Sequence, residues 1–188
     1  MALTQGARNK IKSIVQSAKK LLMKEFESQL QQYYGIRPDG TCLLVEELTS
    51  REASVIETAR LLRQRLHYLE EGIAGSNKAP EAVRQLIREQ AFTILNRFAA
   101  VRMSEERNII RESIRQGYNS EGFLVYDQLT GGAKTADQFT RYTWYIGHVF
   151  DELAIDLPAV FDRFSPYALL FPSEKVLLEL LEIINDED

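Results

Sequence analysis

Hydrophobic positions recur at helical spacing along most of the chain. The clearest case is the segment 89–114, where apolar residues return every three or four positions, as on the buried face of a helix. The residues of this face are Ala91, Leu95, Phe98, Ala99, Met103, Ile110 and Ile114. Phe92, Ile94 and Val101 are also apolar but fall outside it. Because a helix wetted on one side needs no such residues, the pattern predicts a central helix with other helices packed around it.

The chain before this segment predicts two more helices. An apolar stripe runs through residues 4–34, and Gly35 is placed to end that helix in the left-handed conformation. Thr49 and Glu52 have the spacing of a capping box, which predicts a helix from there to about Glu71.

The central helix is expected to begin near Pro80, a residue suited to a first helical turn. Ser104 is followed by two acidic residues, so we expect a kink or a new helix there, ending at Gly117. Residues 118–134 are less regular and predict a loop with a short helix.

Three helices are expected after this region. Thr135 and Gln138 predict a cap for an aromatic-rich helix, residues 156–162 predict a short helix, and Ser173 predicts the start of a final one ending near Ile184. The segment 42–45 is too short for a convincing strand. The predicted fold class is therefore all-α, an irregular multi-helix bundle of about six to eight helices around a central buried helix, in a single domain of 188 residues.

Composition adds the expected environment. The sequence lacks a run of about 18 apolar residues, so no membrane span and no membrane partner is expected. Its first residues lack the apolar core of a secretion signal. The single cysteine, Cys42, cannot form an internal disulfide and fits a reducing cytoplasm, where we expect the protein to lie. We interpret Cys42 as an ordinary loop or core thiol.

Charge divides the chain into a basic and an acidic part. Residues 1–117 contain 19 Lys and Arg against 14 Asp and Glu, whereas residues 118–188 contain 4 against 13. The first part therefore carries +5 and the second −9, which together give the net charge of −4. This asymmetry indicates either an anionic partner for one half and a protein partner for the other, or merely different solvated helix faces.

Two groups of cations are candidates for contact with nucleic acid phosphates. The first group lies beside the apolar stripe of the first helix, where lysines can also form a plain solvated face. It consists of Lys10, Lys12, Lys19, Lys20 and Lys24. The second group comprises Arg97, Arg102 and Arg107 of the central segment. The alternative for Arg97 and Arg102 is structural pairing with Glu105, Glu106 or Asp151.

The sequence contains none of the familiar catalytic signatures. GxGxxG, GxxxxGK[ST], HExxH and GxSxG are all missing, and two histidines with one cysteine cannot build a zinc site by themselves. We expect no catalytic residue and no metal site in these 188 residues. His67 is expected at the surface and His148 in the core, where Tyr142, Trp144, Tyr145 and Phe150 are expected to pack rather than to stack on a base.

Several runs of sequence together resemble a known family. They are AFTILNRFAAVRM (91–103), ERNIIRES (106–113), SEGF (120–123), FDELAIDLPAVF (150–161) and SPYALLFP (165–172). These runs resemble the helical N-terminal part of large adenine-specific DNA methyltransferases. The relatives are the fused type II restriction-modification enzymes and the PglX-like methyltransferases of BREX phage-defence systems. The resemblance extends roughly from Ala7 to the C-terminus.

The resemblance implies a parent enzyme that transfers a methyl group from S-adenosylmethionine to adenine N6 within a recognised DNA sequence. Such an enzyme needs a nucleotide-binding α/β domain and an Asn/Asp-Pro-Pro-Tyr/Phe loop for the flipped adenine. None of the five prolines lies in such a loop. A catalytic domain carrying the S-adenosylmethionine site is therefore expected beyond residue 188, and no cofactor is expected in this segment.

Three hypotheses follow for the function. The first is a non-catalytic N-terminal domain that scaffolds the methyltransferase and contacts the DNA backbone. The second is a protein-interaction module whose acidic part, 118–188, docks a protein partner of a bacterial defence complex. The third is a self-contained enzyme built on His67 or His148.

Overall fold

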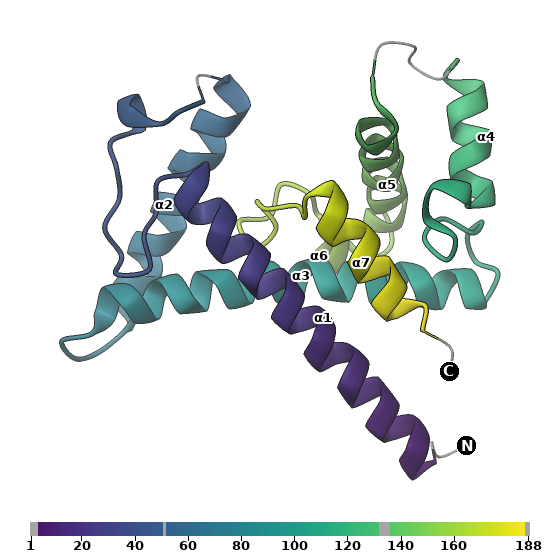
Figure 1. The fold of residues 1–188 in the computed structure, drawn as a ribbon, viewed down its shortest axis with the longest axis horizontal. Helices are drawn as coiled ribbons and strands as arrows, with labels where there is room; N and C mark the ends of the chain where they lie inside the picture. Colours follow the sequence, from purple (N-terminus) through teal and green to yellow (C-terminus); the bar gives the residue numbers. More distant parts are fainter. Residues whose placement is uncertain (1–3, 51, 132–135, 187–188) are drawn as a thin grey trace. The chain divides into compact units, whose positions relative to one another are not determined.

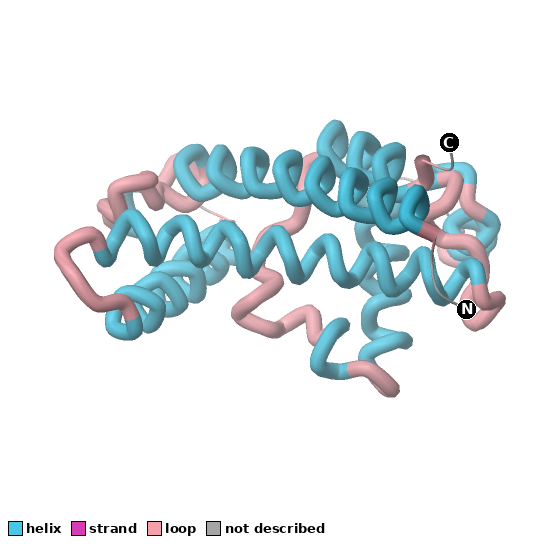
Figure 2. Tube along the Cα trace, turned by 90° about the horizontal axis from the view of Figure 1, so that it is seen from below, coloured by secondary structure: helices cyan, strands magenta, loops and turns pink. Residues whose placement is uncertain are grey.

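The computed structural model describes residues 4–50, 52–131 and 136–186, which form helices joined by loops (Figures 1 and 2). Seven α-helices, two short 3-10 helices and no strand occur within these ranges, which confirms the all-α prediction. The elements are α1 (Gln5–Gln32), η1 (Val45–Glu47), α2 (Ala53–Gly72), α3 (Lys78–Glu106), η2 (Gly117–Asn119), α4 (Glu121–Leu129), α5 (Gln138–Ala154), α6 (Pro158–Phe161) and α7 (Glu174–Ile184).

The helices belong to two compact units. Unit 1 comprises Met1–Ala18, Ile94–Arg163 and Ser173–Asp188, and unit 2 comprises Lys19–Thr93 and Phe164–Pro172. The long helices α1 and α3, purple and teal in Figure 1, each contribute residues to both units.

The core of unit 2 is built from the apolar stripes of α1, α2 and α3. The fully buried members of these stripes include Leu22, Phe26 and Leu30 of α1, Ala59 and Leu62 of α2, and Ala82 and Leu86 of α3. Their spacing of three or four residues is the predicted one. Gly35 ends the first stripe as expected, with φ of 65°, and the amide of Ile36 donates to the carbonyl of Leu30 at 2.8 Å.

Two buried glutamines hold the irregular segment Phe164–Pro172 within unit 2. Gln90 of α3 is 0% exposed; its amide nitrogen donates to the Pro166 carbonyl at 2.9 Å, and its amide oxygen accepts from Leu169 N at 2.7 Å and Leu170 N at 3.2 Å. Gln29 of α1 donates to the Phe171 carbonyl at 3.0 Å. Side chains thus supply the hydrogen bonds that a segment without helix cannot make within itself.

A largely buried ion pair joins α2 to α3 in the same unit. The guanidinium of Arg65 donates to both carboxylate oxygens of Glu89, at 2.9 and 3.0 Å. Tyr68 and Tyr167 lie against the same guanidinium, with ring centroids 5.0 and 4.6 Å from its central carbon. Two parallel hydrogen bonds of this kind fix the relative orientation of the two side chains and also strengthen the attraction between their charges.

The core of unit 1 is aromatic. Phe98 of α3 meets Phe150 of α5 edge-on at 5.9 Å, and Phe150 meets Phe161 of α6 at 5.6 Å. A second group joins α4 and α5, where Phe123 and Tyr142 pack edge-on at 5.1 Å. Edge-to-face contacts of this kind stabilise a core beyond the area they bury.

The central helix is confirmed as a helix, with a different buried surface from the predicted one. Ile94 and Val101, expected outside the main face, are 1% and 0% exposed. Phe92 and Met103 are 39% and 55% exposed, so two predicted core positions face solvent. The reason is that the buried face of α3 follows Ile94, Phe98, Val101 and Glu105, at spacings of three or four residues, and Phe92 and Met103 lie on the opposite side of the helix.

Several predicted helix ends are wrong. Ser104 does not start a new helix, because its hydroxyl donates to the Ala100 carbonyl within α3, and residues 107–116 form no helix. The cap predicted at Thr49 is also wrong, since α2 begins after Glu52. Thr135 lies outside the described residues. The cap of α5 is Asp137, whose carboxylate accepts from Thr140 N at 2.7 Å.

Replacing Gln90 with Leu tests the role of the glutamines. The substitution keeps the size of the side chain but leaves the amides of Leu169 and Leu170 and the carbonyl of Pro166 without their partner, so the free energy of unfolding should fall by about 2–4 kcal/mol. Urea denaturation measures this change in the free energy of unfolding. Gln31→Leu on the exposed side of α1 is the control and should change stability by less than about 0.5 kcal/mol. Equal effects of the two substitutions would contradict the assignment.

Candidate functional site

The lysines predicted to face phosphates differ in how they are engaged. Lys12, Lys20 and Lys24 of α1 are exposed, and no carboxylate in the described ranges lies within ion-pair distance of them. Lys10 lies 3.9 Å from the Asp186 carboxylate, within unit 1. Lys19 is half-buried, with its ammonium 4.8 Å from the centre of the Phe92 ring. Three lysines of the predicted row therefore remain available to an external anion.

Lys20 and Lys24 lie one turn apart on the same exposed face of α1. Like charges at this spacing cost an isolated helix about 0.2–0.5 kcal/mol, a cost that a bound phosphate would remove. Leu22 and Phe26 on the same helix are fully buried, so the two ammonium groups are carried on a fixed backbone.

Arg97 is an internal residue. It is 3% exposed; its Nε donates to the Val160 carbonyl at 2.8 Å and its terminal nitrogen to the Asp162 carbonyl at 2.5 Å. Burial lowers the pKa of this guanidinium. The alternative pairing predicted for Arg97 is wrong in detail, because the partners are carbonyl groups at the end of α6 and not carboxylates. Asp151 instead binds Arg163, with both distances 2.6 Å.

Arg102 and Arg107 have different surroundings. Arg102 forms an ion pair with Glu106, as the structural alternative predicts, and its Nε donates to Asn185 Oδ1 at 2.9 Å. The hydrogen bond from Arg102 lowers the pKa of Glu106. Arg107 is exposed, and within the described part of the chain no acidic group pairs with it. Of the three predicted arginines, Arg107 alone resembles the exposed lysines.

Glu105 holds the loop that follows α3, a role that the sequence does not indicate. Only 8% exposed, it accepts at Oε1 from Ser113 N and Ile114 N, both at 2.6 Å. Burial raises the pKa of this carboxyl, although the two amide bonds and Arg102 act in the opposite direction. A glutamate one residue before the end of a helix is ordinarily solvated, so the sequence offers no signal for this contact.

Buried hydroxyl groups surround the same loop. Ser113 Oγ lies 2.6 Å from Tyr145 Oη, and the Ser113 carbonyl accepts from Tyr142 Oη at 2.8 Å and from Ser120 Oγ at 2.9 Å. Burial raises the pKa of both tyrosines, so neither phenolate forms at neutral pH to activate Ser113. Gly122 faces Tyr145 so closely that a Cβ atom there would collide with the hydroxyl. This cluster packs the loop onto α5.

The histidines and the cysteine do not come together as a site. His67 is exposed on α2, as predicted, 3.4 Å from Glu71. The core position predicted for His148 is wrong, because this residue lies on the outer face of α5 with Trp144, four residues earlier and 47% exposed. Tyr142, Tyr145 and Phe150 are buried as expected, whereas the core packing predicted for Trp144 is wrong. Cys42 is exposed in the loop after α1.

No family model, curated protein or solved structure matches the chain. Among the residues that the structure describes, no three His, Cys, Asp or Glu side chains gather as a metal site. Their helices also include none that combines the length and apolar character of a membrane span.

The raised pKa of Glu105 predicts a pH dependence. The carboxyl group of Glu105 retains its proton to a higher pH in the folded state than in the unfolded state. The contribution of this protonated group to the free energy of unfolding is therefore complete below the ordinary carboxyl pKa and is lost as pH rises through the raised pKa. The free energy of unfolding of the wild type minus that of Glu105→Gln should therefore decrease between about pH 4 and pH 7. Urea denaturation across this range measures the difference. A difference that increases with pH would contradict the assignment.

Proposed function

We propose that the chain is the non-catalytic helical N-terminal domain of a DNA adenine-N6 methyltransferase of a restriction-modification or phage-defence system. In this proposal it scaffolds the catalytic domain in the cytoplasm and contacts the DNA backbone. The catalytic domain and its S-adenosylmethionine site belong to the parent protein beyond residue 188. The resemblance of the runs between residues 91 and 172 supports the choice of family.

The observation that carries the DNA contact is the unpaired state of Lys12, Lys20 and Lys24. The arginines of α3 contrast with them, because Arg97 and Arg102 are committed to internal partners. Exposed lysines without acidic partners bind phosphates with release of the counterions of DNA. Such contacts position a protein on DNA but do not recognise the base sequence. Arg107, which is exposed, and Lys10, which lies beside Asp186, remain further candidates for phosphate contacts. We leave Arg97 out of the proposed contacts because it is buried.

The use of buried polar side chains to hold the chain together supports a scaffolding role. Glu105, Arg97 and Gln90 are buried polar residues, and the hydrogen bonds of their side chains go to backbone groups of the chain itself. Charged groups used in this way shape a domain, since removing one leaves buried backbone groups without partners.

A protein-interaction module is the second candidate. The acidic part of the chain exposes large apolar side chains, among them Leu129 and Ile155, each 81% exposed. Exposed apolar residues in an acidic surrounding suit a protein partner of a defence complex. The experiment below separates the two candidates, because a protein-docking module has no reason to bind DNA through α1.

Charge reversal of Lys20 and Lys24 tests the proposal. We expect Lys20→Glu/Lys24→Glu to weaken binding of a fluorescent DNA duplex at least tenfold at low salt. The slope of log affinity against log salt should also fall by about 1.8, since each phosphate contact contributes about 0.9. Fluorescence anisotropy over a salt series measures both quantities.

The matched control is Lys78→Glu/Lys175→Glu, which makes the same change in net charge at two exposed lysines outside α1. We expect this pair to change affinity less than twofold. Equal losses in both variants, or no DNA binding by the wild type, would contradict the contact through α1.

A further inference from the structure

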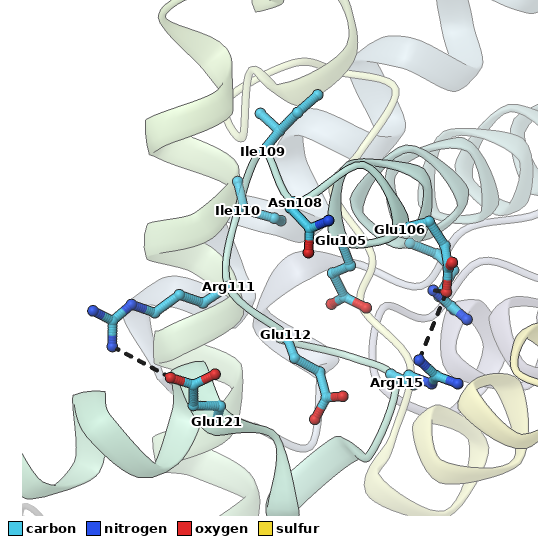
Figure 3. Close-up of a pocket in the computed structure, with 10 residues that line it drawn as sticks. Glu105, Glu106, Asn108, Ile109, Ile110, Arg111, Glu112, Arg115 and Glu121 are labelled. Atoms are coloured by element: carbon cyan, nitrogen blue, oxygen red, sulfur yellow. Dashed lines mark ion pairs between the residues drawn. The ribbon is translucent and has the colours of Figure 1, made fainter.

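A cavity of about 620 Å³ lies in unit 1 beside the end of α3 (Figure 3). Its wall is formed by the last turn of α3, the segment 108–115 and the first residue of α4. Glu105, Ile109, Ile110 and Glu112 are among the lining residues. The hydrogen bonds from Ser113 N and Ile114 N to Glu105 keep the segment in this open curve.

The charges around the cavity are unevenly matched. Three arginines and four glutamates line it. Arg111 pairs with Glu121 at 3.7 Å and Arg115 with Glu106 at 3.9 Å, the two dashed contacts of Figure 3. Arg102 is paired with Glu106 as well. Glu105 and Glu112 lie between these pairs in the same view, and among the described residues neither carboxylate forms an ion pair with a cation.

Glu105 is incompletely satisfied. Its Oε1 accepts two amides, but its buried Oε2 has no hydrogen-bond partner in the described chain. A buried carboxylate oxygen without a donor is costly. Glu105 is among the residues that line the cavity, and the nearby charge of Glu112 makes a cation the most favourable partner for its carboxylate.

The dimensions and the apolar wall indicate which cation fits. A bare metal ion needs far less space than this cavity offers. Among the described residues, no three His, Cys, Asp or Glu side chains gather in a way that could hold one. Ile109, 65% exposed, and Ile110 offer an apolar surface for a hydrocarbon stem. We propose that this cavity binds a primary ammonium group on an alkyl stem, with Glu105 Oε2 and the Glu112 carboxylate as its acceptors.

This proposal is independent of the DNA contact, which involves another helix. The ammonium group has two sources, a free alkyl amine or a lysine side chain of another polypeptide. Titration of the 188-residue chain with 1,4-diaminobutane and, separately, with Nα-acetyl-lysine amide distinguishes them. Calorimetry measures binding, and 1,4-butanediol serves as the neutral ligand of the same length.

We expect saturable binding of at least one of the two amines and none of the diol. Glu112→Gln should weaken that binding at least tenfold. Glu179→Gln, an equal charge change on the exposed side of α7, should weaken it less than twofold. Thermal unfolding of both variants checks that they remain folded, and Glu112→Gln is expected to, because its carboxylate holds no backbone group.

The amine that binds more tightly identifies the source, and either result supports the site. Saturable binding of neither amine would overturn the proposal, as would equal weakening by Glu112→Gln and Glu179→Gln. Binding of the diol as tightly as the diamine would also overturn it, because the cavity would then recognise the stem and not the charge.

Discussion

A backbone amide or carbonyl that leaves water needs another hydrogen-bond partner, and this requirement governs the irregular parts of the fold. Helices meet it within themselves, but residues 107–116 and 164–172 form almost no regular structure. Buried side chains supply the partners instead. Glu105 accepts from the first segment and Gln90 holds the second, while Arg97 donates to the carbonyls that end α6. Hydrogen bonds from these few polar side chains hold the loops against the helices within each unit.

The same groups limit what the domain does chemically. A guanidinium at 3% exposure with two carbonyl acceptors is not available to a phosphate, and a carboxylate holding two amides is not free to move a proton. In the proposed function, charge that faces solvent carries the interactions with partners. On α1 this charge is carried by Lys12, Lys20 and Lys24, which form no ion pair among the described residues and suit the phosphates of the proposed DNA partner.

Regular helices were predictable from the sequence and the loops between them were not. The stripes of α1 and α2, and the left-handed Gly35, follow from local spacing. The bond from Gln29 to Phe171 joins residues 142 positions apart, and no local pattern encodes it. Met103 fits the predicted stripe but is exposed, because the buried face of α3 follows Ile94, Phe98 and Val101 and lies on the opposite side of the helix. At the candidate site, the sequence identified the lysines and the Arg102–Glu106 pair, whereas Glu105 depends on a loop conformation that no spacing reveals.

Hydrogen exchange of individual amides tests most directly whether buried side chains hold these loops. Ser113, Ile114 and Leu169 donate to Glu105 or Gln90 and to no helix carbonyl. If the side chains hold these three amides, they exchange as slowly as the interior amides of α3. The reason is that each of these amides is then exposed to water only when the unit that contains it unfolds. Exchange at the rate of unprotected loop amides, while α3 remains protected, would contradict the account.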